Sequence, residues 1–201
     1  MAPRSRLLPS RINSAAIGGR GASWAKKRVA AFLLLVFMAP AFTGLAASSA
    51  NVTRRMVAVA EVVTGILGYA RWPAASESMQ LCVVGPTEYA DVLLQSGNAA
   101  SRWKDEVLRV AIDDPQITSD CHALYVGVVD DDERQRLFSR LQGFSVLSIS
   151  ERDDSCAIGS MFCLKIRDES VAFDVNLDAV ARSGIKIHPH VLNLGRRTSS
   201  P

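Results

Sequence analysis

The sequence predicts a single α/β domain in which helices flank a mixed, mostly parallel sheet. Helix-like and strand-like apolar segments alternate through the first two thirds of the chain beyond residue 50, which is typical of parallel sheets. Short strands joined by turns follow, and these predict antiparallel additions. With 201 residues, 48% hydrophobic and 21% charged, the chain is long enough for one domain and too apolar to be disordered.

The N-terminal 50 residues have the three parts of a secretory signal peptide. Lys26, Lys27 and Arg28 form a positive segment, an apolar run follows over residues 29–42, and small residues dominate 43–50. This arrangement predicts export to an oxidising compartment.

Signal cleavage sets the expected domain boundary. Small residues at the −3 and −1 positions allow cleavage after Ala46 or after Ala50. We therefore expect a signal peptide over residues 1–50, cleaved between about 46 and 50, a domain over 51–197 and a polar tail at 198–201. An uncleaved membrane anchor is the alternative, which the polar and helix-breaking residues near Pro40 disfavour.

Charge is unevenly distributed along the chain. Seven of the 23 basic side chains and none of the 20 acidic ones lie in the first 50 residues. The whole chain carries a formal charge of +3, but residues 51–201 carry −4. The exported part is mildly acidic, so its composition gives no reason to expect nucleic-acid binding.

The expected domain begins with a helix. Between Met56 and Ala70, apolar residues recur at intervals of three and four, which predicts a helix over 53–70 that Pro73 helps to end. Apolar runs then predict strands at 81–84, 107–112 and 124–129, with a helix from Pro86 to about Gln95 between the first two. The acidic run at 130–133 suits the first turn of a helix that ends near Gly143.

The last third predicts mainly short strands. A strand is expected at 144–149, followed by a hairpin bounded by cysteines, with strand arms near 162–166 and 171–175. A helix over 177–182 is expected to stop at Gly184, and residues 185–188 alternate as a strand does.

Four cysteines follow the signal: Cys82, Cys121, Cys156 and Cys163. An even number in an exported chain predicts disulfides, and four cysteines allow three pairings. The dipeptide at 159–160 predicts a turn that would place Cys156 opposite Cys163. Cys82 and Cys121 accompany two apolar runs that we expect as neighbouring strands, so they form the second predicted pair. A metal site is disfavoured because no C-x-x-C spacing occurs.

The chain lacks the common catalytic signatures, including G-x-S-x-G, the Walker loop and H-E-x-x-H. His188 and His190 flank a proline and suggest a weak two-histidine metal site, but exposed polar residues on a late strand are the favoured interpretation. Arg182, Lys186 and His188 offer donors for a carboxylate or phosphate, with a solvated basic face as the alternative. We predict no metal and no cofactor, and the missing signatures do not by themselves exclude an enzyme.

Three segments resemble the YfiR family of periplasmic repressors. They are Y-A-R-W-P at 69–73, C-A-I-G-S-M-F-C at 156–163 and D-V-N-L-D-A-V-A-R-S-G-I-K-I-H-P-H-V-L at 174–192. The resemblance covers about residues 51–197, and the order of the segments, with four cysteines in matching places, is more specific than any one of them.

The resemblance implies a regulatory protein that is not an enzyme. A YfiR-like protein is expected to act on the periplasmic region of an inner-membrane diguanylate cyclase and to lower cyclic-di-GMP synthesis. An outer-membrane OmpA-like lipoprotein is expected to sequester it and relieve the repression. The resemblance also implies a homodimer and two intramolecular disulfides, and disulfide reduction is a hypothesis for a second control.

Such a repressor needs an exposed surface for its partners, because it must favour one conformation of its target. The candidate residues are Arg71, Trp72, Arg182, Lys186, Ile187 and His188. Tryptophan and arginine are the side chains most often found as interface anchors. A core or dimer-contact position is an equal alternative for Trp72. The alternative function is a periplasmic module that binds small molecules or anions through Arg182, Lys186 and His188.

Overall fold

The computed structural model describes residues 44–74, 78–96, 106–153, 156–167 and 170–197. The expected signal peptide lies outside this part up to residue 43, and so does the expected tail at 198–201. The two predicted cleavage positions fall in the first turns of α2 (Gly44–Tyr69). Among the described helices, none combines the length and the apolar character that crossing a bilayer requires.

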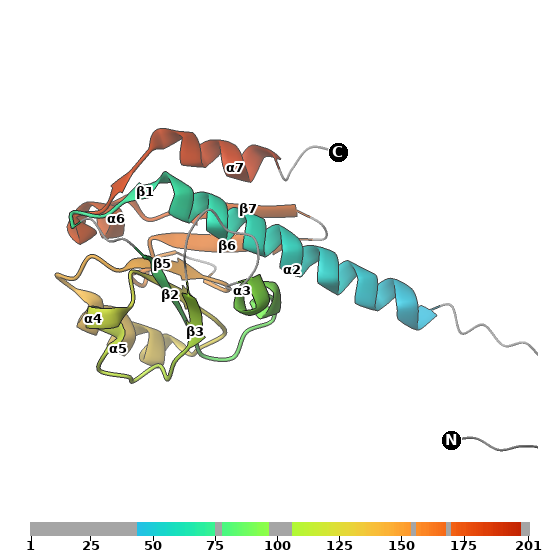
Figure 1. Cartoon of the computed structure of the whole chain (residues 1–201), viewed down its shortest axis with the longest axis horizontal. Helices are drawn as coiled ribbons and strands as arrows, with labels where there is room; N and C mark the ends of the chain where they lie inside the picture. Colours follow the sequence, from blue (N-terminus) through green and yellow to red (C-terminus); the bar gives the residue numbers. More distant parts are fainter. Residues whose placement is uncertain (1–43, 75–77, 97–105, 154–155, 168–169, 198–201) are drawn as a thin grey trace, which may run out of the picture. The chain divides into compact units, whose positions relative to one another are not determined.

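A six-stranded sheet forms the centre of the domain, in the order β3-β2-β4-β5-β6-β7 (Figure 1). The strands are β2 (Gln80–Val84), β3 (Glu106–Arg109), β4 (Ala123–Val126), β5 (Leu147–Ser150), β6 (Phe162–Arg167) and β7 (Ser170–Val175). Neighbouring strands from β3 to β6 are parallel, and β7 alone is antiparallel to its neighbour. The predicted α/β class with a mixed, mostly parallel sheet is confirmed.

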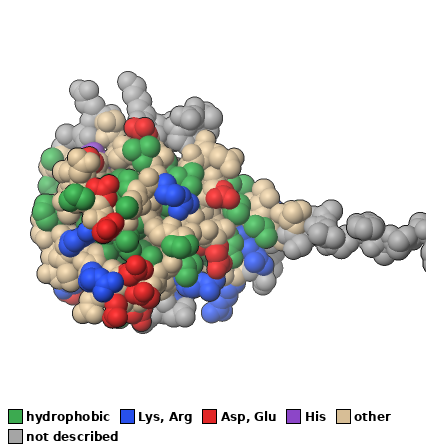
Figure 2. Space-filling model, turned by 90° about the horizontal axis from the view of Figure 1, so that it is seen from below, with side chains coloured by type: hydrophobic (Ala, Val, Ile, Leu, Met, Phe, Trp, Pro, Cys, Tyr) green, Lys and Arg blue, Asp and Glu red, His purple; other side chains and the backbone are tan. Residues whose placement is uncertain are grey.

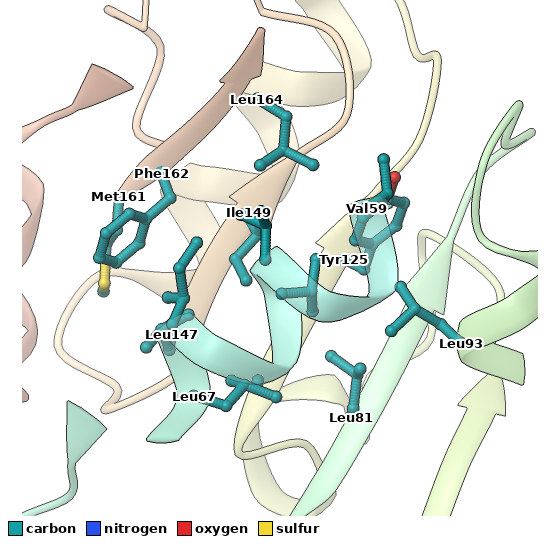
Figure 3. Close-up of a cluster of buried hydrophobic side chains, with 14 of the residues drawn as sticks. Val59, Leu67, Leu81, Leu93, Tyr125, Leu147, Ile149, Met161, Phe162 and Leu164 are labelled. Carbon is teal, nitrogen blue, oxygen red and sulfur yellow. The ribbon is translucent and has the colours of Figure 1, made fainter. Parts of the chain in front are cut away.

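Helices cover both faces of this sheet. In strand β2, successive side chains point to opposite faces of the sheet. Leu81 and Val83 join one core with α2, whereas Cys82 and Val84 join a second core with α5 (Asp131–Leu141). Figure 3 shows the first core, where side chains of α2 meet those of the central strands. The smaller helices are α3 (Asp91–Ser96), α4 (Ile117–Asp120), α6 (Leu177–Ser183), the 3-10 helix η1 (Pro189–Val191) and α7 (Leu192–Arg197).

Helix α2 confirms the predicted period and extends further than predicted. Val59, Val63 and Ile66 are fully buried, as their spacing on one helical face requires. The helix begins at Gly44 instead of residue 53, and side chains from Ser49 to Arg54 are exposed. Its first turns project beyond the sheet (Figure 1), so burial does not fix the start of this helix.

The helix predicted from Pro86 is wrong at its start, since α3 begins at Asp91. The segment before it packs against the end of β4: the Val128 amide donates to the Pro86 carbonyl at 2.6 Å, and a Cβ at Gly127 would lie 2.0 Å from the same oxygen. The Glu88 amide donates to the Glu151 carboxylate at 2.6 Å. These long-range contacts hold the segment outside a helix.

Strand β5 begins at Leu147, three residues after the predicted start. Gly143 has a positive φ of 83°, and the Phe144 amide donates to the Leu141 carbonyl at 3.1 Å. Residues 142–146 therefore complete the end of α5 before the chain enters the sheet. Strands β3 and β4 are likewise shorter than predicted, and α4 was not predicted.

Both predicted disulfides are present, Cys82–Cys121 and Cys156–Cys163. The hairpin expected to close the second one is wrong. Residues 157–161 form a loop, Cys156 has a positive φ of 51°, and only Cys163 lies in a strand. The observed hairpin joins β6 to β7 instead, which confirms the two predicted strand arms.

The C-terminal elements form a separate two-stranded ribbon. Helix α6 ends at Gly184 in the left-handed conformation, as predicted, with φ at 73°. Strand β8 (Lys186–Ile187) then pairs antiparallel with β1 (Ala70–Arg71), the segment that follows α2. The helical turns after Pro189 were not predicted.

Candidate partner-binding surface

The ribbon brings together candidate residues from the two ends of the domain. Arg71 lies opposite Lys186, and Ala70 lies opposite Ile187. The His188 amide donates to the Tyr69 carbonyl at 3.0 Å and extends the pairing by one step. We call the surface formed by Arg71, Trp72, Lys186, Ile187 and His188 the β1–β8 corner.

A surface pocket of about 430 Å³ opens at this corner. It is lined by Gly68, Tyr69, Arg71, Lys186, Ile187, His188 and Pro189. The His188 ring stacks on Tyr69 with 6.1 Å between ring centroids, and the His190 ring meets His188 edge-on at 4.7 Å. The pocket therefore has an aromatic and aliphatic floor with two exposed cationic side chains on its rim.

The Arg71 side chain is held against the backbone at the end of α2. Its guanidinium donates to the Gly68 carbonyl at 2.9 Å and to the Ala70 carbonyl at 2.6 Å. The first bond satisfies a carbonyl that the end of α2 leaves without an intrahelical partner, and the second is to the neighbouring carbonyl in β1. Because Arg71 is exposed and its partners are uncharged, its positive charge remains available to a ligand or a partner.

Trp72 links the corner to the core. Its side chain is half-buried and packs against the main core, and its indole N–H donates to the His122 carbonyl at 3.0 Å. The His122 ring in turn accepts from the Gln80 amide at 3.2 Å through Nδ1. Trp72 is thus neither fully buried nor fully exposed, and both interpretations of it stay predictions.

Arg182 lies apart from the other five candidates. It extends from α6, forms an ion pair with Asp178, and lines a different pocket of about 450 Å³ beside Phe138 and Phe144. Lys186 and His188 share the corner pocket without it. The predicted three-residue anion site is thus divided between two pockets.

Residues 57–196 match the family model described as YfiR/HmsC-like. The chain belongs to the YfiR/HmsC-like family. The match extends from α2 to α7 and includes both disulfides and the whole β1–β8 corner. Family membership makes the protein a periplasmic regulator connected with diguanylate cyclase signalling, and the family is regulatory and non-catalytic.

Two disulfides in this YfiR/HmsC-like chain are consistent with an oxidising compartment. His188 and His190 are adjacent, but Nδ1 of His188 accepts from the His190 amide at 3.2 Å. Within the described ranges, no three His, Cys, Asp or Glu side chains are grouped as a metal site requires.

Charge is mixed on the face seen from below in Figure 2. Acidic and basic side chains alternate there with hydrophobic ones over the described surface. In the first turn of α5, the Asp130 carboxylate accepts from the Glu133 amide at 2.7 Å and caps the helix. This acidic run therefore has a structural role.

Tyr125 and Glu151 form a buried polar pair at the carboxyl end of the parallel strands, which was not predicted from the sequence. The Tyr125 hydroxyl donates to Glu151 at 2.7 Å, and both side chains are buried. Burial raises the pKa of Glu151, whereas the bonds from Tyr125 and the Glu88 amide act in the opposite direction. Burial and the neighbouring Glu151 charge raise the pKa of Tyr125. The available signal was the position of Glu151 immediately after a fully buried strand.

Proposed function

We propose that this protein binds the periplasmic region of an inner-membrane diguanylate cyclase through the β1–β8 corner and thereby represses cyclic-di-GMP synthesis. The observation that carries the proposal is the pairing of β1 with β8, which joins Arg71 and Trp72 to Lys186, Ile187 and His188 on one surface. Apolar and aromatic groups surrounded by cationic side chains are typical of an interface centre and its rim.

The corner suits a target surface that carries carboxylates. Arg71 and Lys186 lie opposite each other on neighbouring strands, where like charges repel at short range. A carboxylate between them relieves that repulsion. For repression, the protein must bind the inactive conformation of the cyclase more tightly than the active one.

Relief of repression follows from competition in this proposal. An outer-membrane OmpA-like lipoprotein would bind the repressor and lower the free concentration available to the cyclase. The proposal includes a homodimer, as the resemblance implies, which sedimentation equilibrium of the mature protein tests directly. It also includes disulfide reduction as a second route to relief, because each disulfide stabilises the fold.

The test uses charge reversal at the corner. Arg71→Glu combined with Lys186→Glu should abolish co-purification with the cyclase periplasmic region and raise cellular cyclic-di-GMP to the level of a deletion strain. Arg136→Glu on α5, at an exposed position away from the corner, is the matched control and should repress normally. Full repression by the corner variant would reject the proposal.

A second function has its own supporting observation, the corner pocket itself. Its volume of about 430 Å³ is within the range of small-molecule sites, and its cationic rim suits a carboxylate or phosphate. Calorimetric titration with a panel of carboxylates and phosphates tests this alternative. A ligand-binding module would be favoured by two results together. The protein would bind one of these ligands, more weakly in Lys186→Ala, and it would fail to bind the cyclase.

A further inference from the structure

Strand β6 has two unequal sides. Along its whole length, from Phe162 to Arg167, it pairs with β7. On its other side only Phe162 and Cys163 pair with β5, which ends at Ser150. The β6–β7 hairpin therefore extends past β5 (Figure 1), and no strand in the described ranges continues the sheet beside residues 164–167.

The backbone pattern shows which groups face this open side. The Asn176 amide donates to the Met161 carbonyl at 2.9 Å, which sets the alternation of bonded positions along the hairpin. By that alternation Lys165 and Arg167 direct their backbone groups to β7. The amide and carbonyl of Ile166, with the carbonyl of Leu164, face the opposite side and are aligned for one more strand.

A pocket of about 530 Å³ occupies the space where that strand would lie. Residues 164–167 form one wall, and Tyr89, Glu151 and Arg152 form another, at the carboxyl ends of the parallel strands. Open α/β sheets bind ligands at this end. We call this place the β6 notch.

The cationic side chains around the notch favour an acidic occupant. Arg152 and Arg167 are exposed, and the Lys165 side chain is 26% exposed. Arg152 forms an ion pair with Glu88 at 2.8 Å, and Lys165 forms one with Asp174 at 3.5 Å. Ion pairs at the surface contribute little to stability, so carboxylates of a partner can replace Glu88 and Asp174 at little cost.

Glu151, the remaining carboxylate of the notch, does not present its charge at the surface, where it would repel an acidic occupant. Glu151 is buried and bonded to the Tyr125 hydroxyl. Three cations therefore border the open edge, two of them paired with the exposed carboxylates of Glu88 and Asp174, which leaves an excess of positive charge. The same charges disfavour pairing with a second copy of this chain, since two basic edges would meet.

We propose that the β6 notch binds an extended, acidic segment of a partner protein, which adds a strand to β6. The main-chain groups of Ile166 supply the strand pairing, and Arg152 and Arg167 select carboxylate side chains. This surface is distinct from the β1–β8 corner, since the two pockets share no residue.

A display experiment tests this proposal with random peptides in place of a chosen partner. Phage-displayed heptapeptides are selected against the mature, disulfide-intact protein. We expect enrichment of peptides that alternate β-branched residues with Asp or Glu and contain no central proline. Synthetic copies of these peptides should bind at least tenfold more weakly to Arg167→Glu and to Ile166→Pro, which removes an amide from the open edge.

Controls separate this site from the corner and from misfolding. Arg136→Glu makes the same charge change on α5 and should bind the peptides normally, and Lys186→Glu should do so as well. Circular dichroism checks that each variant is folded, and Arg167→Glu remains informative where Ile166→Pro does not fold. The proposal is overturned by absence of enrichment, by peptides that bind Arg167→Glu with unchanged affinity, or by peptides that lose binding only in Lys186→Glu.

Discussion

The β1–β8 corner and the carboxyl end of the parallel strands place their polar groups in opposite environments. At the corner, Arg71 and Lys186 are exposed, and the elements are joined mainly through backbone pairing. At the strand ends, Tyr125 and Glu151 are buried, and the carboxylate connects β4 to the segment before α3. Polar side chains are therefore free to contact a partner at the corner, whereas they hold the fold together at the strand ends.

This difference separates stability from binding. An exposed side chain that makes few internal contacts contributes little to the free energy of unfolding. A buried polar group without its partner costs about 1–3 kcal/mol. Substitutions at the corner should thus affect partner binding, whereas substitutions at the strand ends should affect folding.

The largest expected effect comes from the Cys82–Cys121 disulfide in the parallel half of the sheet. This bond closes a separation of 39 residues, for which the loop-entropy model gives about 4 kcal/mol. Cys82→Ser with Cys121→Ser should lower the free energy of unfolding by about that amount in urea denaturation. Cys156→Ser with Cys163→Ser, which opens a separation of 7, should cost about 2.5 kcal/mol.

The same variants test redox control. At equal periplasmic abundance, a variant that lacks one disulfide should repress the cyclase less than the wild type if reduction relieves repression. Unchanged repression by both abundant variants would reject control by disulfide reduction.

The next largest effect on stability is expected from the buried Tyr125 hydroxyl at the strand ends. Tyr125→Phe leaves the Glu151 carboxylate without one of its donors and should destabilise the fold by about 1–3 kcal/mol. Tyr69→Phe at the corner is the matched control and should change stability by less than about 0.5 kcal/mol. Equal effects of the two substitutions, measured by urea denaturation, would contradict the distinction between the regions.

The sequence predicted the fold best where hydrophobic periodicity and local chemistry agree. The stripe of α2, the strands from Leu81 and from Phe162, the acidic first turn of α5 and the left-handed Gly184 all follow from short-range rules. Residues 86–90 show the limit, because the contacts of Pro86 and Glu88 are with residues far along the chain. Such contacts depend on the assembled sheet.

The candidate surface was predictable in part for the same reason. Lys186 and Ile187 lie on β8 and His188 follows it directly, in a segment with visible alternation, but the partner strand β1 has only two residues and shows no period. The placement of Arg182 depends on how α6 faces α5, which spacing along the chain does not indicate. Glu151 was missed because a single carboxylate after a strand resembles an ordinary loop residue.

The buried Glu151 at the strand ends should make the stability of the fold depend on pH. Burial raises the pKa of Glu151 above its ordinary value of 4.5, so the folded protein binds this proton more tightly than the unfolded chain does. The favourable contribution of Glu151 to the free energy of unfolding is complete below pH 4.5 and is lost as pH rises through the pKa of this group in the folded protein. The neighbouring titratable groups that face Glu151 are Tyr125, Tyr89 and Glu88.

Glu151→Gln should remove this dependence. The amide accepts from Glu88 through its oxygen and donates to the Tyr125 hydroxyl through its nitrogen, so both contacts persist. Wild-type stability relative to the variant should therefore fall as pH rises from about 4.5 through the raised folded pKa of Glu151 in a series of urea titrations. A difference that grows with pH would mean that the bonds to the carboxylate outweigh its burial.

The smallest effect on stability is expected at the β1–β8 corner. Lys186→Ala removes an exposed side chain from a two-residue strand and leaves the backbone pairing with Arg71 intact. Its unfolding free energy should differ from the wild type by no more than about 0.5 kcal/mol, while its affinity for the cyclase periplasmic region should fall at least tenfold. A loss of stability comparable to that of Tyr125→Phe would show that Lys186 supports the fold, because an exposed side chain that acts only in binding leaves unfolding unchanged.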